Sequence, residues 1–306
     1  MTEIKKVLRP ALFDVEHAIN MYAYSYVTMP ADAIYDKKML SQYSEILSKC
    51  HIYIIGFHPT IQLIDANQVE RNLSLNFKVN LEDKEVTLPL PDDLDLLVDG
   101  DTFSLVNKAG KRMWFNDIDI NRIINQSVST LEFNIQYIGQ SYGKDGSRNA
   151  MTRLLKHETL QKIALQGVPE GQRLTLLLLE IEPSNRLITS FNPHAEVKDE
   201  GSRIKSGLEK LYSTSEQERI SLYEASLIRY FSPKFNKEFK NSFPSTNLKV
   251  LQDCYEKDFS AVIAEISISE LPFQLCSDTI KASPSHISKH HLHDDAKRKI
   301  FFFESQ

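Results

Sequence analysis

A run of apolar residues in the second half of the chain constrains the fold more than any other feature. Residues 174–179 read Leu-Thr-Leu-Leu-Leu-Leu, after Arg173 and before Glu180. The run is far shorter than the roughly 20 residues that a membrane-spanning helix needs. Because apolar side chains occupy both alternating positions, we expect a strand that is buried on both faces, lies centrally in a sheet and ends before Pro183.

The segments around this strand alternate between strand and helix patterns. We expect a strand over 130–139, then a helix over 148–165 that is closed by Gly167 and Pro169. Residues 183–213 are polar and irregular, and we interpret them as an inserted loop. A capping box follows, which predicts another helix. Its two capping residues and its end are Ser215, Glu218 and Pro233.

The first part of the chain has a different pattern. Residues 11–26 carry apolar side chains at three- and four-residue steps, which favours a helix, and a second helix is expected over 31–49. Residues 52–114 contain strand-forming runs separated by turn signals. We therefore predict an accessory α+β domain over residues 1–125, for target or partner binding, and a second domain over residues 126–306.

Charge is distributed unevenly along the chain. Of 41 acidic and 36 basic side chains, residues 1–130 hold 18 and 13, so they account for the net charge of −5. This distribution excludes a surface that is positive everywhere, but it permits a local basic groove in the second half. The widely spaced Cys50, Cys254 and Cys276 predict buried free thiols. The first residues have no secretory pattern, so we expect a cytoplasmic location.

Four short motifs in the second half follow one another in the order strand, helix, helix, loop. They are Tyr137-Ile-Gly-Gln-Ser, Arg153-Leu-Leu-Lys-His157, Glu224, and the Pro-Lys-Phe-Asn that ends at Asn236. In these residues the chain resembles the GIY-YIG nuclease family, over about residues 130–240. The resemblance implies an α+β fold with a small antiparallel sheet flanked by helices in the second half, beside a separate α+β N-terminal domain.

The chemistry of these residues fits the resemblance. Hydrolysis of a phosphodiester needs a positioned water and positive charge beside the phosphate. Glu224 supplies a hard oxygen ligand for Mg²⁺ or Mn²⁺. Arg153 and His157, four residues apart, are expected on one helix face, where they can bind phosphate and exchange a proton. Tyr137 can hydrogen-bond the attacking water, and Asn236 is expected to tie its loop to the site.

The predicted catalytic residues also have ordinary structural interpretations. Tyr137 could be a strand aromatic, Arg153 and His157 a solvated helix face, and Asn236 a turn residue. Glu224 differs from them, because it lies beside the apolar stripe of its predicted helix. A carboxylate in such a position is costly unless it has a partner or a cation.

The chain departs from the family pattern in its first motif. GIY-YIG nucleases carry a Gly-Ile-Tyr about ten residues before the YIG, and its tyrosine is a leading candidate for the general base. Residues 113–130 contain no tyrosine. Trp114 and Phe115 could fill the space without taking a proton, and Tyr142 or Tyr53 could substitute. The insertion at 183–213 is a second departure.

The sequence leaves two main hypotheses. The first is a metal-dependent endonuclease acting on DNA, with RNA not excluded, in which the N-terminal domain serves for dimerisation or a protein partner. Analogy suggests a setting in restriction or anti-phage defence. The alternative is a catalytically inactive nuclease fold that binds nucleic acid or protein. A C-terminal histidine cluster could hold Zn²⁺ or form a polar segment, and it comprises His286, His290, His291 and His293.

Overall fold

The computed structural model describes residues 11–115, 119–120, 122–124, 131–143, 150–245 and 247–298. Within them, no helix is long and apolar enough to cross a membrane. An eight-stranded sheet forms the body, in the order β13-β9-β2-β10-β1-β12-β14, with β11 also paired to β1. Its strands are β1 (Val15–Pro30), β2 (Ile52–Pro59), β9 (Glu132–Gln140), β10 (Gln172–Ile181), β11 (Arg186–Phe191), β12 (Ala261–Ser267), β13 (Gln274–Cys276) and β14 (Ser285–His291).

The apolar run predicted as a central strand is β10, and this prediction is confirmed. It lies between β1 and β2, antiparallel to both. Leu176 to Leu179 are fully buried, because they alternate between the apolar cores on the two faces of the sheet. The rest of the sheet is mixed, since β12 runs parallel to β1 and β13 parallel to β9.

The helix predicted over residues 11–26 is wrong. Residues 15–30 form the 16-residue strand β1 instead. A step of four residues keeps a side chain on the same face of a strand as well as of a helix, so spacings such as Val15 to Ile19 do not distinguish the two. Pairing with β10, β11 and β12 then fixes the strand.

The predicted fold class is also wrong. The second half does not form a small antiparallel sheet of its own, and the first half does not form a separate domain beside it. The single large sheet takes β1 and β2 from before residue 60 and its other strands from after residue 130. These pairings join segments more than 75 residues apart in the sequence, which no local pattern predicts. The domain boundary expected near residue 125 falls at 125–130, outside the described residues.

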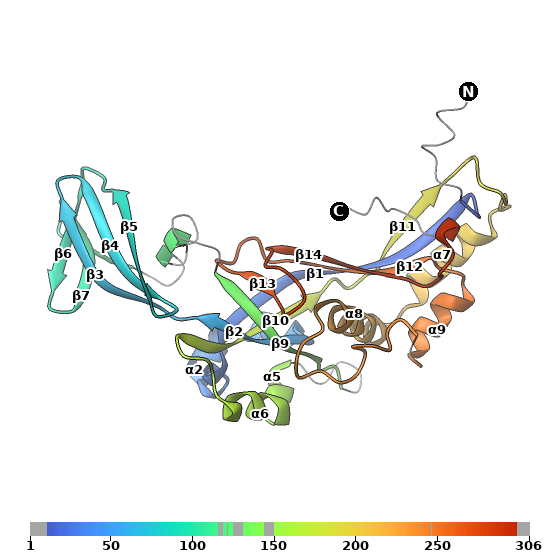
Figure 1. The fold of residues 1–306 in the computed structure, drawn as a ribbon, viewed down its shortest axis with the longest axis horizontal. Coiled ribbons are helices and arrows are strands. Elements are labelled where there is room, and N and C mark those ends of the chain that lie inside the picture. The colour runs from blue at the N-terminus through green and yellow to red at the C-terminus, as the bar shows by residue number, and fades with distance from the viewer. Residues whose placement is uncertain are drawn as a thin grey trace.

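The strands predicted between residues 52 and 114 are present, and most of them form an arm that projects from the sheet (Figure 1). The arm is inserted between β2 and β9 and contains two three-stranded antiparallel sheets. Their strands are β3 (Ile61–Val69), β4 (Asn72–Val79), β5 (Glu82–Pro89), β6 (Leu94–Asp99), β7 (Thr102–Asn107) and β8 (Arg112–Trp114). Trp114, at the edge of the arm, is exposed.

Helices cover both faces of the main sheet. One face packs against η1 (Ala31–Tyr35), α2 (Lys37–Gln42), α3 (Ser44–Lys49), α5 (Ala150–Leu154) and α6 (Glu158–Gln166). The other face packs against α8 (Glu216–Phe231) and α9 (Lys249–Glu256), while α7 (Ser202–Ser213) lies along β1 and β11. The predicted capping box is confirmed at the start of α8, where Ser215 and Glu218 cap each other. The described part of the chain ends in η3 (Ala296–Arg298).

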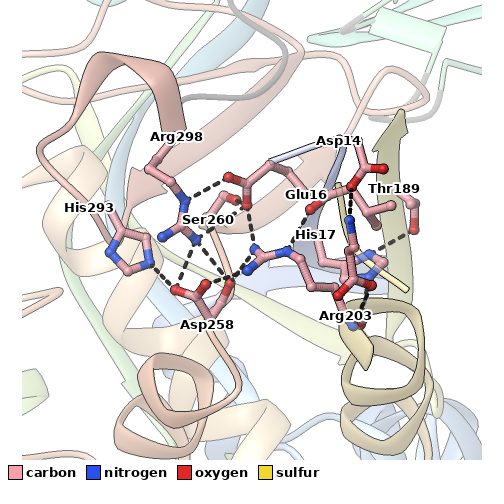
Figure 2. A network of polar contacts seen from close by, with 11 residues as sticks. Asp14, Glu16, His17, Thr189, Arg203, Asp258, Ser260, His293 and Arg298 are labelled. Carbon is pink, nitrogen blue, oxygen red and sulfur yellow. Dashed lines mark hydrogen bonds and ion pairs between the residues drawn. The ribbon is translucent and has the colours of Figure 1, made fainter. Parts of the chain in front are cut away.

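A buried ion network ties the end of the described chain to β1 (Figure 2). The Glu16 carboxylate is 2% exposed and receives Arg203 Nη2 at 2.8 Å and Arg298 Nε at 2.6 Å. Ser260 Oγ also donates to Glu16, and Asp258 pairs with both arginines. We call Glu16, Arg203, Asp258, Ser260 and Arg298 the Glu16 network.

Candidate active site

Two tyrosines meet where β2 and β9 run side by side. The antiparallel register sets Tyr53 opposite Gly139, and the rings of Tyr53 and Tyr137 stack with centroids 6.2 Å apart. A Cβ at Gly139 would lie 2.5 Å from Tyr53 Cζ and Oη, so only glycine leaves room for the Tyr53 ring at this position. The glycine of the Tyr137-Ile-Gly motif is therefore required by the neighbouring strand.

His157 connects the tyrosines to α6. It is the N-cap of that helix, and its Nδ1 accepts the backbone N–H of Leu160 at 3.1 Å. The neutral ring therefore carries its proton on Nε2, which lies 2.9 Å from Tyr53 Oη and donates to it. Burial, reinforced by the charge of Arg153, lowers the pKa of His157 to about 4, so the ring is neutral at neutral pH.

Arg153 reaches the same place from a different helix. The helix predicted over 148–165 is interrupted: α5 ends at Leu154, and α6 begins after His157. The expectation that Arg153 and His157 share one helix face is therefore wrong. The exposed Arg153 nevertheless hydrogen-bonds Tyr53 and lies close enough to act on Tyr137, His157 and Glu224.

Glu224 approaches from α8, on the other side of β9. Its side chain is 8% exposed and is hydrogen-bonded by Gln140, whose amide Nε2 donates to Ser221 Oγ at 3.2 Å. Burial raises the pKa of Glu224 to about 8; Glu238 adds to this shift, whereas Gln140 and Arg153 oppose it. Glu224 forms no ion pair with any described residue. The group is therefore a buried carboxyl without an ion-pair partner among the described side chains.

Asn236 closes the gap between α8 and β9. β13 pairs only with residues 132–134 of β9, which leaves the rest of that strand edge open. Asn236 Oδ1 accepts the Ile138 N–H at 2.9 Å, and Asn236 Nδ2 donates to the Ile138 carbonyl at 2.8 Å. The side chain thus replaces the missing strand and holds the loop after α8 beside the site, in the position predicted for it.

The structure brings Tyr137, Arg153, His157 and Glu224 within reach of one another and adds Tyr53, while Asn236 is held on the backbone of the neighbouring Ile138. From the sequence we considered Tyr53 and Tyr142 as substitutes for the tyrosine of the absent Gly-Ile-Tyr motif. Tyr142 hydrogen-bonds Glu216 at 2.8 Å, whereas Tyr53 contacts both Tyr137 and His157. The signal was present in the Ile-Tyr-Ile-Ile-Gly run of 52–56, but the inserted arm separates it from the Tyr137 motif.

Basic side chains lie at the rim of the site. Lys162 from α6 and Lys234 from the loop after α8 both lie over the ring of Phe235, with Nζ 6.0 and 5.5 Å from its centroid. Phe235 N–H donates to the Gln136 carbonyl on β9, which holds this ring next to Asn236. Both lysines are exposed, so their charges are open to solvent beside Phe235.

The C-terminal histidines do not form a zinc centre in the described residues, where no group of three or more His, Cys, Asp or Glu is placed to hold a metal. His286 Nε2 instead hydrogen-bonds the Leu275 carbonyl at 2.9 Å, and His290 Nε2 the Ser226 carbonyl at 3.0 Å. The predicted free thiols are confirmed, since Cys50, Cys254 and Cys276 are buried and unpaired with one another.

No family model, curated protein or solved structure matches the chain. The arrangement of the site therefore has to be interpreted from its own geometry.

Proposed function

We propose that this protein is a metal-dependent endonuclease that hydrolyses DNA phosphodiester bonds, uses Mg²⁺ or Mn²⁺, and acts in the cytoplasm. One observation carries the proposal. Tyr53, Tyr137 and His157 converge with an exposed arginine beside Glu224, a buried carboxyl that forms no ion pair with a described side chain. A buried carboxyl is stable as an anion only beside positive charge, and a divalent ion held between this group and a phosphate would supply it.

The residues have separable roles in this proposal. Glu224 would hold the ion once its carboxyl is deprotonated, and the ion would neutralise charge on the phosphate. Arg153 binds a non-bridging phosphate oxygen. Tyr53 receives a hydrogen bond from His157, so its oxygen is fixed and its own O–H is directed toward Tyr137 or the attacking water. Lys162 and Lys234 would contact the flanking phosphates.

The proton transfer has a specific electrostatic requirement. Burial raises the pKa of Tyr53 above its ordinary value, and Tyr137 and Glu224 add to this, while Arg153 acts in the opposite direction. Burial also raises the pKa of Tyr137. A phenol in this setting would act as a base only after losing its own proton, and nearby positive charge, from Arg153 and a bound metal ion, would favour that loss by lowering the phenol pKa.

The same raised tyrosine pKa values favour one alternative, a module of this geometry that binds nucleic acid without cutting it. That module would bind DNA in a salt-dependent way and would be indifferent to replacement of Glu224. The proposed biological setting, restriction or anti-phage defence with the arm serving a partner or a second copy, follows from analogy and from the acidic charge of the first half.

Cleavage of supercoiled DNA separates the two functions. The wild-type protein should nick the plasmid with Mg²⁺ or Mn²⁺ and should be inactive with a chelator. Glu224→Gln should reduce nicking by about 1,000-fold or more, because a lost metal ligand removes several kcal/mol of transition-state stabilisation. Glu209→Gln, an exposed carboxylate on α7, is the matched control and should be fully active. Binding without cleavage by the wild-type protein, under all metals, would contradict the enzyme assignment.

A further inference from the structure

A pocket with no role in the proposed reaction opens where β1 loses its second neighbour. β12 pairs with β1 only as far as Ala23, so the edge of β1 beyond Ser25 is not covered by that strand. A cavity of about 400 Å³ lies there, which is within the range for small-ligand sites. Its walls are apolar and come from residues 26–30, Met39, Tyr43 and residues 271–273.

Two buried polar groups line this pocket without a side-chain partner. His58 on β2 is 2% exposed, and its ring has a polar contact with the backbone of the adjacent Pro59 but none with another side chain. The hydroxyl of Thr175 on β10 is also buried and unpaired. Other buried histidines are satisfied: His17 bonds Thr189 and the Arg203 carbonyl, and His286 bonds a carbonyl as well. Unpaired buried donors and acceptors cost stability, so their retention at one cavity points to a ligand.

Arg173 adds a charge to the same end of the pocket. It lies directly opposite His58 in the β2–β10 register and two residues before Thr175, so all three are on one face of the sheet. Arg173 is exposed and has no carboxylate partner in the described part of the chain. Burial, together with the charge of Arg173, lowers the pKa of His58 to about 4, so the ring is neutral. The polar end therefore carries one positive charge.

We propose that this pocket binds a small monocarboxylic acid with an apolar or aromatic body. The carboxylate pairs with the guanidinium of Arg173 and accepts from the imidazole N–H of His58 and the hydroxyl of Thr175. The body packs against Phe273, whose ring already lies edge-on to His58 with centroids 5.1 Å apart. One arginine without a lysine matches a single negative charge better than the double charge of a phosphate.

Binding of benzoate, phenylacetate and octanoate to the intact protein tests the proposal by calorimetry. At least one acid should bind the wild-type protein and raise its melting temperature. Arg173→Gln should weaken that binding by roughly tenfold or more, because a hydrogen bond to a charged group is lost. Arg112→Gln, an exposed arginine on β8, is the matched control and should leave binding unchanged. If none of the three acids binds, or if Arg173→Gln binds them equally well, the proposal is overturned.

Two further variants separate a ligand site from a packing defect. Thr175→Val keeps the shape of the side chain and removes the hydroxyl, so it should weaken acid binding several-fold and leave the fold intact. His58→Phe should abolish acid binding and raise the melting temperature of the free protein, because an unpaired polar group is removed. Phenylacetamide, which lacks the charge, should bind at least tenfold more weakly than phenylacetate. Equal binding of the amide would contradict the ion pair with Arg173.

Discussion

The Glu16 network and the site around Glu224 both bury a carboxylate, with opposite electrostatics. Glu16 is surrounded by Arg203, Arg298 and the Ser260 hydroxyl (Figure 2). The guanidinium carbons of Arg203 and Arg298 lie 4.1 and 4.9 Å from the centroid of the Phe13 ring. Burial tends to raise the pKa of Asp258, but Arg203 and Arg298 outweigh it and the pKa is lowered.

Glu224 has the same degree of burial without this compensation. Its pKa is raised to about 8, its hydrogen-bond partner is a neutral amide, and the nearby Arg153 is exposed at the rim. The difference distinguishes structure from function. Glu16 finds its counter-ions within the chain and holds segments together, whereas Glu224 is the carboxyl that our proposal assigns to a metal ion.

Breaking the Glu16 network should give the largest effect on stability. Glu16→Gln leaves two buried arginines with one counter-charge fewer, and loss of one partner in a buried ion cluster costs about 3–5 kcal/mol. Urea unfolding measures this loss. Glu196→Gln removes the exposed pair with Lys297 and should cost less than about 1 kcal/mol. Equal effects of the two variants would mean that the network contributes no more than a surface pair.

Replacing Glu224 should raise the free energy of unfolding, whereas replacing Glu16 lowers it, and the gain should depend on pH. The folded wild-type protein holds the Glu224 proton up to about pH 8, whereas the unfolded chain releases it near the ordinary value of 4.5. Folding therefore binds an extra proton between these two values, and wild-type stability falls as pH rises through that window. Each unit of pKa shift corresponds to roughly 1.4 kcal/mol, so the cost approaches a few kcal/mol above pH 8.

Glu224→Gln lacks this titration and should melt at a higher temperature than the wild type above pH 8, with little difference near pH 4.5. Differential scanning calorimetry across this range measures the divergence. Mg²⁺ added at pH 8 should stabilise the wild-type protein and leave Glu224→Gln unchanged. If the melting temperatures of the two proteins changed with pH in parallel, Glu224 would not differ from Glu16 in its electrostatics.

Tyr53→Phe sharpens the comparison within the site. Loss of the hydroxyl that His157 positions should reduce the cleavage rate by about 100-fold, within the usual contribution of a general base, while DNA affinity stays unchanged. Single-turnover cleavage and fluorescence anisotropy measure the two quantities. Tyr142→Phe removes the hydrogen bond to Glu216, which lies outside the proposed catalytic residues, and should cleave normally. If both variants cleave equally, Tyr53 is a packing residue.

Replacing the two exposed lysines beside Phe235, Lys162 and Lys234, should have the smallest effect, and that effect should be on DNA affinity. The double variant Lys162→Ala and Lys234→Ala should weaken DNA binding by about tenfold, and should reduce the slope of log affinity against log salt concentration by about two. A double variant of Lys78 and Lys205, exposed on β4 and α7, is the control and should bind normally. A change in cleavage without a change in salt slope would place these lysines outside the DNA path.

The sequence alone determined the parts of this protein that depend on neighbouring residues. The run from Leu174 predicted a central strand, and the Ser215 and Glu218 pair predicted the start of α8. The four motifs named Tyr137, Arg153, His157 and Glu224, which the structure places near one another. Each of these depends on a local pattern, such as alternation, capping or fixed spacing, that the chain carries wherever it folds.

Only the tertiary structure decided the position of β1, the single sheet and the role of Tyr53. The spacing of Val15 and Ile19 fits a helix or a strand equally well, and pairing with three other strands settled it. Tyr53 reaches Tyr137 only because β2 and β9 pair across the inserted arm. Strand pairing is a contact between distant segments, so its outcome depends on the whole chain rather than on any window of it.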